Sequence, residues 1–252
     1  MSGHSKWSTI KHKKAAKDAK RGKAFGKLIR AIETSARGAG TSDPEASPSL
    51  ALAVQKAKDA SVPKDNIERA CKRGAGELDG GTTYELAQYE GYGPGGVAVL
   101  VDCLTDNRNR TASDVRQAFT KAGGNLAEPG SVAFLFSRRG QVVVEANGAS
   151  EDELMMVGLD HGMEDLEAQD EQFLAWCDPG DVQDLRKAIE EAGFTVADAG
   201  APMVPASTVP VSEAAHARQV LRLLDLLDDN DDVQEVWDNV DIDDDVLAEL
   251  DA

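Results

Sequence analysis

The hydrophobic positions of the N-terminal third recur at helical spacing. A first amphipathic stripe comprises Phe25, Leu28, Ile29 and Ile32, at i, i+3, i+4 and i+7. Gly38 and Gly40 end this predicted helix. Before it, residues 2–20 are small, polar and cationic, with Trp7 and Ile10 as the large apolar exceptions. Such a segment has no face that can bury itself, so we expect an arm that is loose until a partner binds.

Two shorter helices are expected next, after a Pro- and Ser-containing linker at 41–49. Ser47 is placed to cap the second helix, with Pro48 in its first turn. The third helix should run from about Pro63 to Gly74. The inward-facing positions of these two helices are Leu50, Val54, Ala57, Ile67, Ala70 and Cys71. The pattern therefore predicts a small all-α domain.

From Gly80 onward the pattern changes to short strands alternating with helices. Strands are expected at 84–90, 97–102, 132–136, 141–145, 165–168, 172–177, 194–205 and 233–237. Helices are expected at 112–122, 151–158, 181–192 and 213–227. The middle run has the order β-α-β-β-α-β of a ferredoxin-like domain. The segment 84–124 supplies only β-β-α, so the C-terminal helix and strand could complete it around an inserted middle domain. The Asp-rich tail is expected to be a solvated terminus.

Charge is distributed unevenly along the chain. The formal net charge is -18, yet residues 1–76 carry 17 Lys and Arg against 7 Asp and Glu, a net of +10. The remaining residues carry 10 against 38, a net of -28. This asymmetry favours a polyanion-binding head on an acidic body that repels phosphate. The alternative is that the charges only aid solubility.

The candidate nucleic-acid-binding residues lie in this basic head. Lys13, Lys17 and Lys20 would share one helical face, where like charges at i, i+4 are unfavourable unless a phosphate backbone compensates them. Trp7 could stack on a base or sugar. Lys outnumbers Arg, which suits contact with the backbone rather than base reading. The candidates are Lys6, Trp7, Lys11, His12, Lys13, Lys14, Lys17, Lys20, Arg21, Lys23, Lys27, Lys64, Arg69, Lys72 and Arg73. The alternative is a solvated basic face.

A second candidate is the polar loop at 105–111, which precedes a predicted helix. It carries Asn107, Arg108, Asn109 and Arg110, and a helix N-terminus can bind phosphate. Capping of the helix is the favoured alternative.

Several apparent chemical motifs are better explained as ordinary structural features. The glycines at 91–96 match GxGxxG, but a strand follows them where a dinucleotide site needs a helix, so a hairpin turn is expected. The acidic run at 228–232 lacks the glycine of a calcium loop. His161 beside Glu164 and Asp165 is better explained as a turn. The cysteines, Cys71, Cys103 and Cys177, form no CxxC pair and are expected to be buried free thiols. We expect no active site, cofactor or metal.

Five blocks of sequence together resemble the YebC family of bacterial regulatory proteins over essentially the whole chain. They are GHSKW at 3–7, IKHKK at 10–14, VPKDNIERA at 62–70, YEGYGPGG at 89–96 and LTDNRNRT at 104–111. The resemblance implies an all-α N-terminal domain followed by two ferredoxin-like α/β domains, one inserted into the other. The expected boundaries are 1–79, 80–133 with 207–252, and 134–206. Cys71, Trp237 and the stretch around His161 depart mildly from the family pattern.

The resemblance also implies a function. Members are usually described as DNA-binding transcriptional regulators, whereas mitochondrial relatives act on translation and bacterial members have been linked to the ribosome. We therefore expect a non-enzymatic regulator whose partner is DNA, with ribosomal RNA and the ribosome as the alternative. An apolar run long enough to span a membrane is absent, and no secretory signal is recognisable. Because Met1 and Ser2 directly precede the first block, we expect a cytoplasmic protein of the bacterial type.

Overall fold

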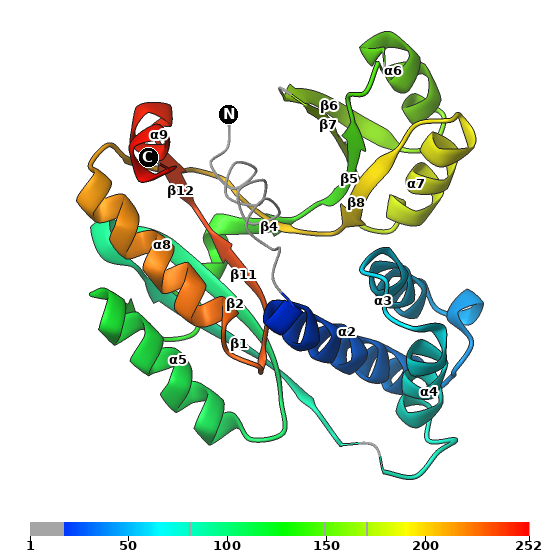
Figure 1. Ribbon diagram of the computed structural model, residues 1–252, viewed down its shortest axis with the longest axis horizontal. Helices are drawn as coiled ribbons and strands as arrows, with labels where there is room; N and C mark the ends of the chain where they lie inside the picture. Colours follow the sequence, from blue (N-terminus) through cyan, green and yellow to red (C-terminus); the bar gives the residue numbers. More distant parts are fainter. Residues whose placement is uncertain (1–17, 81, 149, 170, 252) are drawn as a thin grey trace. The chain divides into compact units, whose positions relative to one another are not determined.

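A computed structural model describes residues 18–80, 82–148, 150–169 and 171–251 (Figure 1). The chain divides into two compact units. The first unit comprises Met1–Thr34, Gly80–Ser137 and Val204–Ala252, and the second comprises Ser35–Asp79 and Arg138–Met203. Helix α2, Asp18–Ala39, begins in the first unit and ends in the second.

The first unit is built on a four-stranded antiparallel sheet in the order β11-β2-β1-β3. Its strands are β1 (Glu85–Tyr92), β2 (Ala98–Thr105), β3 (Asn125–Leu126) and β11 (Val233–Asp238). The predicted completion of this sheet by a C-terminal strand is confirmed, since β11 pairs with β2. The GxGxxG segment is the expected hairpin turn, in which the 3-10 helix η2 (Pro94–Gly96) holds Gly95 and Gly96 at positive φ.

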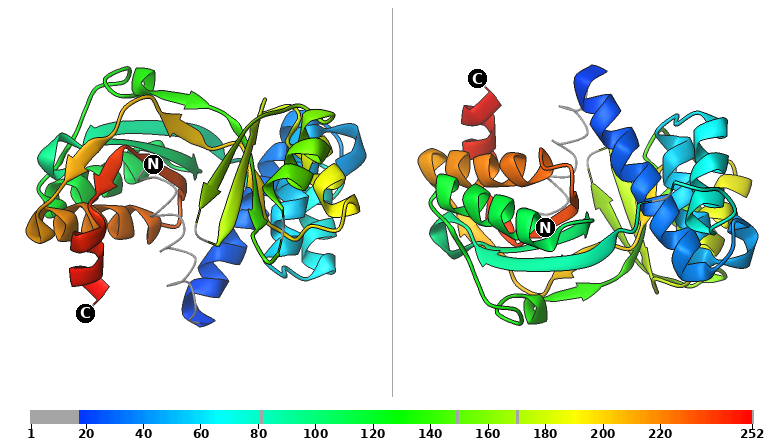
Figure 2. Two further views of the ribbon diagram at one scale, coloured as in Figure 1. Left: turned by 90° about the horizontal axis from the view of Figure 1, so that it is seen from above. Right: turned by 90° about the horizontal axis from the view of Figure 1, so that it is seen from below.

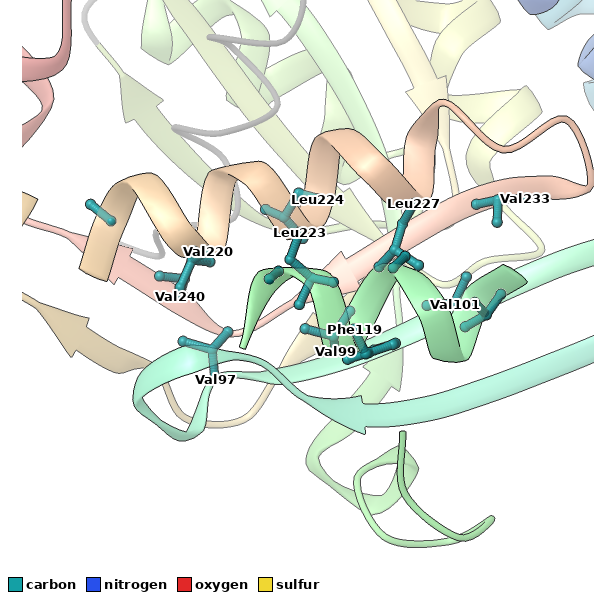
Figure 3. Packing of buried hydrophobic residues seen from close by; sticks show 14 of the residues in the cluster. Val97, Val99, Val101, Phe119, Val220, Leu223, Leu224, Leu227, Val233 and Val240 are labelled. Atoms are coloured by element: carbon teal, nitrogen blue, oxygen red, sulfur yellow. The ribbon is translucent and has the colours of Figure 1, made fainter. Parts of the chain in front are cut away.

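Helices α5 (Arg108–Ala122) and α8 (Ala214–Asp228) lie side by side in both views of Figure 2 and pack on one face of this sheet. Figure 3 shows their apolar side chains directed at β2. The core between the helices and the sheet contains fully buried side chains from both layers, including Val97, Val99, Val101, Phe119, Val220, Leu223 and Leu227. Burial of each such side chain contributes about 1.5–3 kcal/mol. A Cβ on Gly91 of β1 would lie 2.5 Å from the Phe119 ring of α5, so glycine is required where α5 meets β1.

The C-terminal tail is folded, so the prediction of a solvated terminus is wrong. Strand β12 (Val240–Ile242) pairs in parallel with β10 (Val209–Val211), and α9 (Asp244–Asp251) follows. Val240, Ile242 and Val246 are buried in the core of the first unit. These aliphatic residues are interleaved with the aspartates, and their burial decides the structure of the tail.

The helical part of the second unit agrees with the sequence pattern. It contains the 3-10 helix η1 (Pro44–Ala46), α3 (Pro48–Asp59) and α4 (Lys64–Gly74). The Ser47 hydroxyl accepts a hydrogen bond of 3.4 Å from the Leu50 backbone N–H, which confirms the predicted cap. All six predicted inward-facing residues of α3 and α4 are buried.

The second unit also contains the predicted ferredoxin-like domain. Its antiparallel sheet has the order β6-β7-β5-β8, and the chain order is β-α-β-β-α-β. The elements are β5 (Gly140–Glu145), α6 (Glu151–Leu159), β6 (Met163–Gln169), β7 (Gln172–Cys177), α7 (Val182–Glu191) and β8 (Val196–Gly200). Buried Arg186 of α7 forms a bidentate ion pair with Asp59 of α3, at 2.8 and 3.2 Å. This pair ties the helices to the domain.

Two strand predictions need correction. The expected strand at 132–136 is instead the 3-10 helix η3 (Ala133–Leu135) followed by β4 (Phe136–Arg138). The expected strand at 194–205 is divided into β8 and β9 (Met203–Pro205), and β9 pairs with β4. At 132–136, the backbone N–H groups of Val132 and Ala133 donate to the Glu90 carboxylate and not to a neighbouring strand.

Candidate nucleic-acid interface

The predicted basic site falls partly outside the described residues. Those outside are Lys6, Trp7, Lys11, His12, Lys13, Lys14 and Lys17. Lys20 and Arg21 lie in the first turns of α2. The remaining candidates on α2 are Lys23 and Lys27, and Arg30 continues their spacing of i, i+4, i+7. Lys23, Lys27 and Arg30 therefore form one stripe along the helix, referred to below as the α2 stripe.

The α2 stripe contacts the acidic turn at 228–232, which connects α8 to β11 within the first unit. The Lys23 ammonium donates to the Asp229 carbonyl at 3.1 Å. Lys27 donates to the Asp228 carbonyl at 2.7 Å and to its carboxylate at 3.3 Å. Arg30 donates to the Asp231 carbonyl and lies 3.5 Å from the Asp232 carboxylate.

The contacts of Lys23 and Lys27 have a common electrostatic origin at the C-terminus of α8. The last carbonyls of α8 have no partner within the helix and carry the negative end of its dipole, which cations stabilise. The Lys27 side chain is only 16% exposed, whereas Lys23 is exposed. Lys27 and Arg30 are therefore engaged in contacts inside the protein, and Lys23 is the most accessible residue of the α2 stripe.

Asp232 is the centre of this cluster. One of its carboxylate oxygens accepts from Arg110 at 2.7 Å, from the Thr111 hydroxyl at 2.8 Å and from the Thr105 hydroxyl at 3.4 Å. Burial alone would raise the pKa of Asp232, but the hydrogen bonds from Arg110 and Thr111 hold it below the usual value. The Arg30 guanidinium also lies over the Tyr84 ring, 5.4 Å from its centroid. Sequence reasoning did not single out Asp232, and its position in an acidic run gave no signal that it would be buried.

The loop at 105–111 is a capped helix start in the structure. The Asn107 side chain accepts from the Arg110 backbone N–H at 3.1 Å, and α5 begins at Arg108, four residues before the predicted start. The Arg108 guanidinium lies 3.4 Å from Glu85 and donates to the Leu86 carbonyl. The Arg110 guanidinium bonds Asp106 and Asp232. Both arginines thus have carboxylate partners inside the first unit, which supports the capping interpretation.

Helix α4 presents the remaining candidates. Ile67, Ala70 and Cys71 face the interior, which directs Arg69 and Lys72 outward, and both are exposed. Lys64 is the first residue of the helix and is also exposed. Arg73 is half-buried. Lys64 lies 3.6 Å from Glu68, a pair so exposed that it contributes little. Lys72 and Arg73 in the last turn also favour the helix dipole, so part of their charge has a local role.

The described residues offer little for other chemistry. Cys71, Cys103 and Cys177 are buried free thiols, as predicted. Burial raises the pKa of Cys103 to about 12 and that of Cys177 to about 11, so both stay protonated and unreactive. Over the described ranges, no three His, Cys, Asp or Glu side chains gather as metal ligands would. Within the same ranges, no helix has both the length and the apolar character needed to cross a bilayer.

Comparison with known proteins gives a consistent result over the whole chain. Residues 5–77 match the model of the TACO1/YebC protein N-terminal domain, and residues 84–240 match that of the TACO1/YebC second and third domain. A "probable transcriptional regulatory protein" of Nocardia farcinica is 56% identical over 252 residues, the full length of both chains. One of Mycolicibacterium smegmatis is 55% identical, covering 100% of this chain and 99% of its own. The crystal structure of a conserved hypothetical protein from Aquifex aeolicus superimposes with a TM-score of 0.82 at 45% identity, covering 93% and 96% of the two chains.

Proposed function

Because the chain belongs to the TACO1/YebC family, whose relatives above are named as probable transcriptional regulatory proteins, we propose that it is a non-enzymatic, DNA-binding regulator. In this proposal, the Lys-rich arm and the start of α2 bind the phosphate backbone. DNA and ribosomes are both cytoplasmic in bacteria, and we place the protein there.

The observation that carries the proposal is the charge distribution. A head of net +10 precedes a body of net -28, so a polyanion is attracted to one part of the chain and repelled by the rest. Each phosphate that a lysine neutralises releases condensed counterions, and this entropy gain drives binding without regard to sequence.

The described residues indicate which cations are available. Lys27, Arg30, Arg108 and Arg110 have acceptors inside the first unit, and withdrawing them would leave carboxylates or carbonyls unpaired. We therefore assign phosphate contact to the arm, to Lys20 and Arg21, to Lys23, whose bond to the Asp229 carbonyl is exposed to solvent, and to the exposed cations of α4. The latter are Lys64, Arg69 and Lys72.

A second candidate function is binding to ribosomal RNA as a translation factor. It is favoured by the predominance of Lys over Arg in the head, because lysine contacts backbones and lacks the planar fork that reads guanine. Recognition of shape and backbone is typical of double-stranded RNA binding. The same surface would serve either polyanion.

Sedimentation of DNase-treated native lysate separates the two functions. The wild-type protein is compared with a variant carrying Lys13→Glu, Lys17→Glu and Lys20→Glu. If DNA is the partner, the protein remains at the top of the gradient and binds promoter fragments in a separate assay. Co-migration with ribosomes that the variant loses would establish the ribosomal alternative instead. A protein that binds neither DNA nor ribosomes would refute both.

A further inference from the structure

A groove lies on the helical side of the ferredoxin-like domain. Helices α6 and α7 cover one face of the sheet, and their inward side chains form the core of the second unit (Figure 1). The groove has a volume of about 520 Å³ and is built from residues of this unit alone. Its apolar lining residues are Met156 and Val157 of α6, together with Ala192 and Phe194, which follow α7.

Helix α6 carries apolar side chains that the domain does not cover. Met156 is 67% exposed and Leu159 is 62% exposed. Their spacing of i, i+3 places them on one face of the helix, whereas Leu154 and Gly158 on the other face are buried. A single exposed apolar residue is common on protein surfaces, but two neighbours beside an apolar-lined groove are typical of an interaction surface.

The surroundings of the groove are strongly acidic. Residues 138–203 carry 4 Lys and Arg against 16 Asp and Glu, a net of -12. The carboxylates that line the groove are Glu153 and Asp160, both exposed, and His161 completes the lining. Any partner that covers the apolar side chains must therefore approach a negative surface.

The two carboxylates have different relations to the dipole of α6. Glu153 lies in the first turn, where a negative charge stabilises the helix. Asp160 is the C-cap residue, where a carboxylate meets the negative end of the dipole and is unfavourable. Helix stability therefore explains Glu153 but not Asp160. A cationic partner would offset the unfavourable placement of Asp160.

We propose that this groove binds a Lys- and Arg-rich segment of another protein, whose apolar side chains cover Met156 and Leu159. The inference goes beyond the proposed function, because it assigns a partner to the acidic body. Nucleic acid and anionic membrane surfaces are repelled by a domain of net -12, and so is the same face of a second copy. A lysine or arginine side chain suits the groove, since its alkyl stem packs on apolar surface while its charged head meets Glu153 or Asp160.

The test measures the binding of labelled peptides to the full chain by fluorescence anisotropy. The probe is a fluorescein-labelled peptide of about 18 residues, with leucine at helical spacing and lysine elsewhere. Replacing its leucines with serine should weaken binding by about 10-fold or more, because apolar burial is lost. Replacing its lysines with glutamate should abolish measurable binding.

Two variants of the protein locate the peptide at the groove. Met156→Ala should weaken binding of the leucine–lysine peptide by about 5- to 10-fold, as expected for an apolar contact inside an interface. Asp160→Lys should weaken it by about 2- to 5-fold at low salt, and this difference should vanish at high salt. Both positions are exposed, and a lysine favours the end of a helix, so both variants should fold, which thermal unfolding checks.

Matched controls change the same properties away from the groove. Asp165→Lys makes the same charge change at an exposed position of β6. Leu86→Ala removes a side chain of β1 that is 70% exposed. Both controls should bind the peptide within about 2-fold of the wild type, because solvent screens distant charges.

Three results would overturn the inference. The first is equal binding by the wild type, Met156→Ala and Asp160→Lys. The second is an equal loss in the groove variants and in their controls, which would show general attraction to an acidic chain. The third is self-association of the wild-type protein that Asp160→Lys abolishes, which would assign the groove to a second copy. Each of these results leaves the nucleic-acid proposal unchanged.

Discussion

At the scale of single residues, Asp232 determines how the first unit holds its basic side chains. Its carboxylate is 8% exposed and receives hydrogen bonds from Arg110 of α5 and from the hydroxyls of Thr105 and Thr111. Arg30 of α2 lies beside its second oxygen. One buried charge thus joins the helix that carries the α2 stripe to the sheet and to the start of α5.

Replacing Asp232→Asn tests this role. Removing one partner of a buried charged network costs about 3 kcal/mol, so we expect a loss of that order in the free energy of unfolding at neutral pH. Because the folded pKa of Asp232 lies below the unfolded value, the stability it contributes is present above about pH 4 and is lost as pH falls through the folded pKa. The difference between wild type and variant, measured by urea unfolding, should therefore shrink in acid.

Asp231→Asn is the matched control, since this neighbour is exposed and contributes its backbone carbonyl to Arg30. Its unfolding free energy should differ from that of the wild type by less than about 0.5 kcal/mol at every pH. Equal, small effects of both substitutions would contradict the central position given to Asp232.

At the scale of elements, the cations of α2 fall into two groups. Lys27 and Arg30 contact the acidic turn that follows α8, whereas we propose that the cations nearer the start of α2 bind nucleic acid. Charge reversals in the two groups should therefore have different effects.

Lys27→Glu places a carboxylate against the Asp228 carbonyl and should destabilise the protein by about 1–2 kcal/mol through the helix dipole. Lys20→Glu should leave stability within about 0.5 kcal/mol of the wild type. It should weaken nucleic-acid binding and lower the magnitude of the salt slope by about one for each phosphate that the protein no longer neutralises. Thermal unfolding and fluorescence anisotropy measure the two effects. A Lys20→Glu protein that binds as tightly as the wild type would remove this part of α2 from the interface.

Elements whose determinants are local were predictable. The Ser47 cap, the stripe of α3 and the strands β5 and β7 follow from residues within one helical turn or one alternation. Failures occurred where distant contacts decide the conformation. The 3-10 turn η3 depends on Glu90, some forty residues earlier in the chain, and β12 depends on pairing with β10. The aspartates around Val240 and Ile242 led to the prediction of a solvated tail, although these two aliphatic residues are buried and the tail is folded.

The candidate site was predictable in kind but not in detail. Counting charges identified the basic head, because net charge needs no contacts. It could not tell that Lys27 and Asp228, about two hundred residues apart, would be hydrogen-bonded, or that Arg110 would bond Asp232. The role of Glu90 in fixing η3 was also missed, because a charged residue in a strand resembles an ordinary sheet residue.

At the scale of the whole molecule, the central claim is that a cationic head binds a polyanion and an acidic body does not. The most direct measurement is the affinity of the full chain for duplex DNA and for a ribosomal RNA fragment as a function of salt. The comparison is with the Lys13→Glu, Lys17→Glu, Lys20→Glu variant. If six to ten phosphates are contacted, affinity should fall by roughly 10³- to 10⁵-fold between 50 and 200 mM salt, and the variant should bind more weakly with a shallower slope. An affinity that hardly changes with salt, or a variant that binds like the wild type, would contradict the claim.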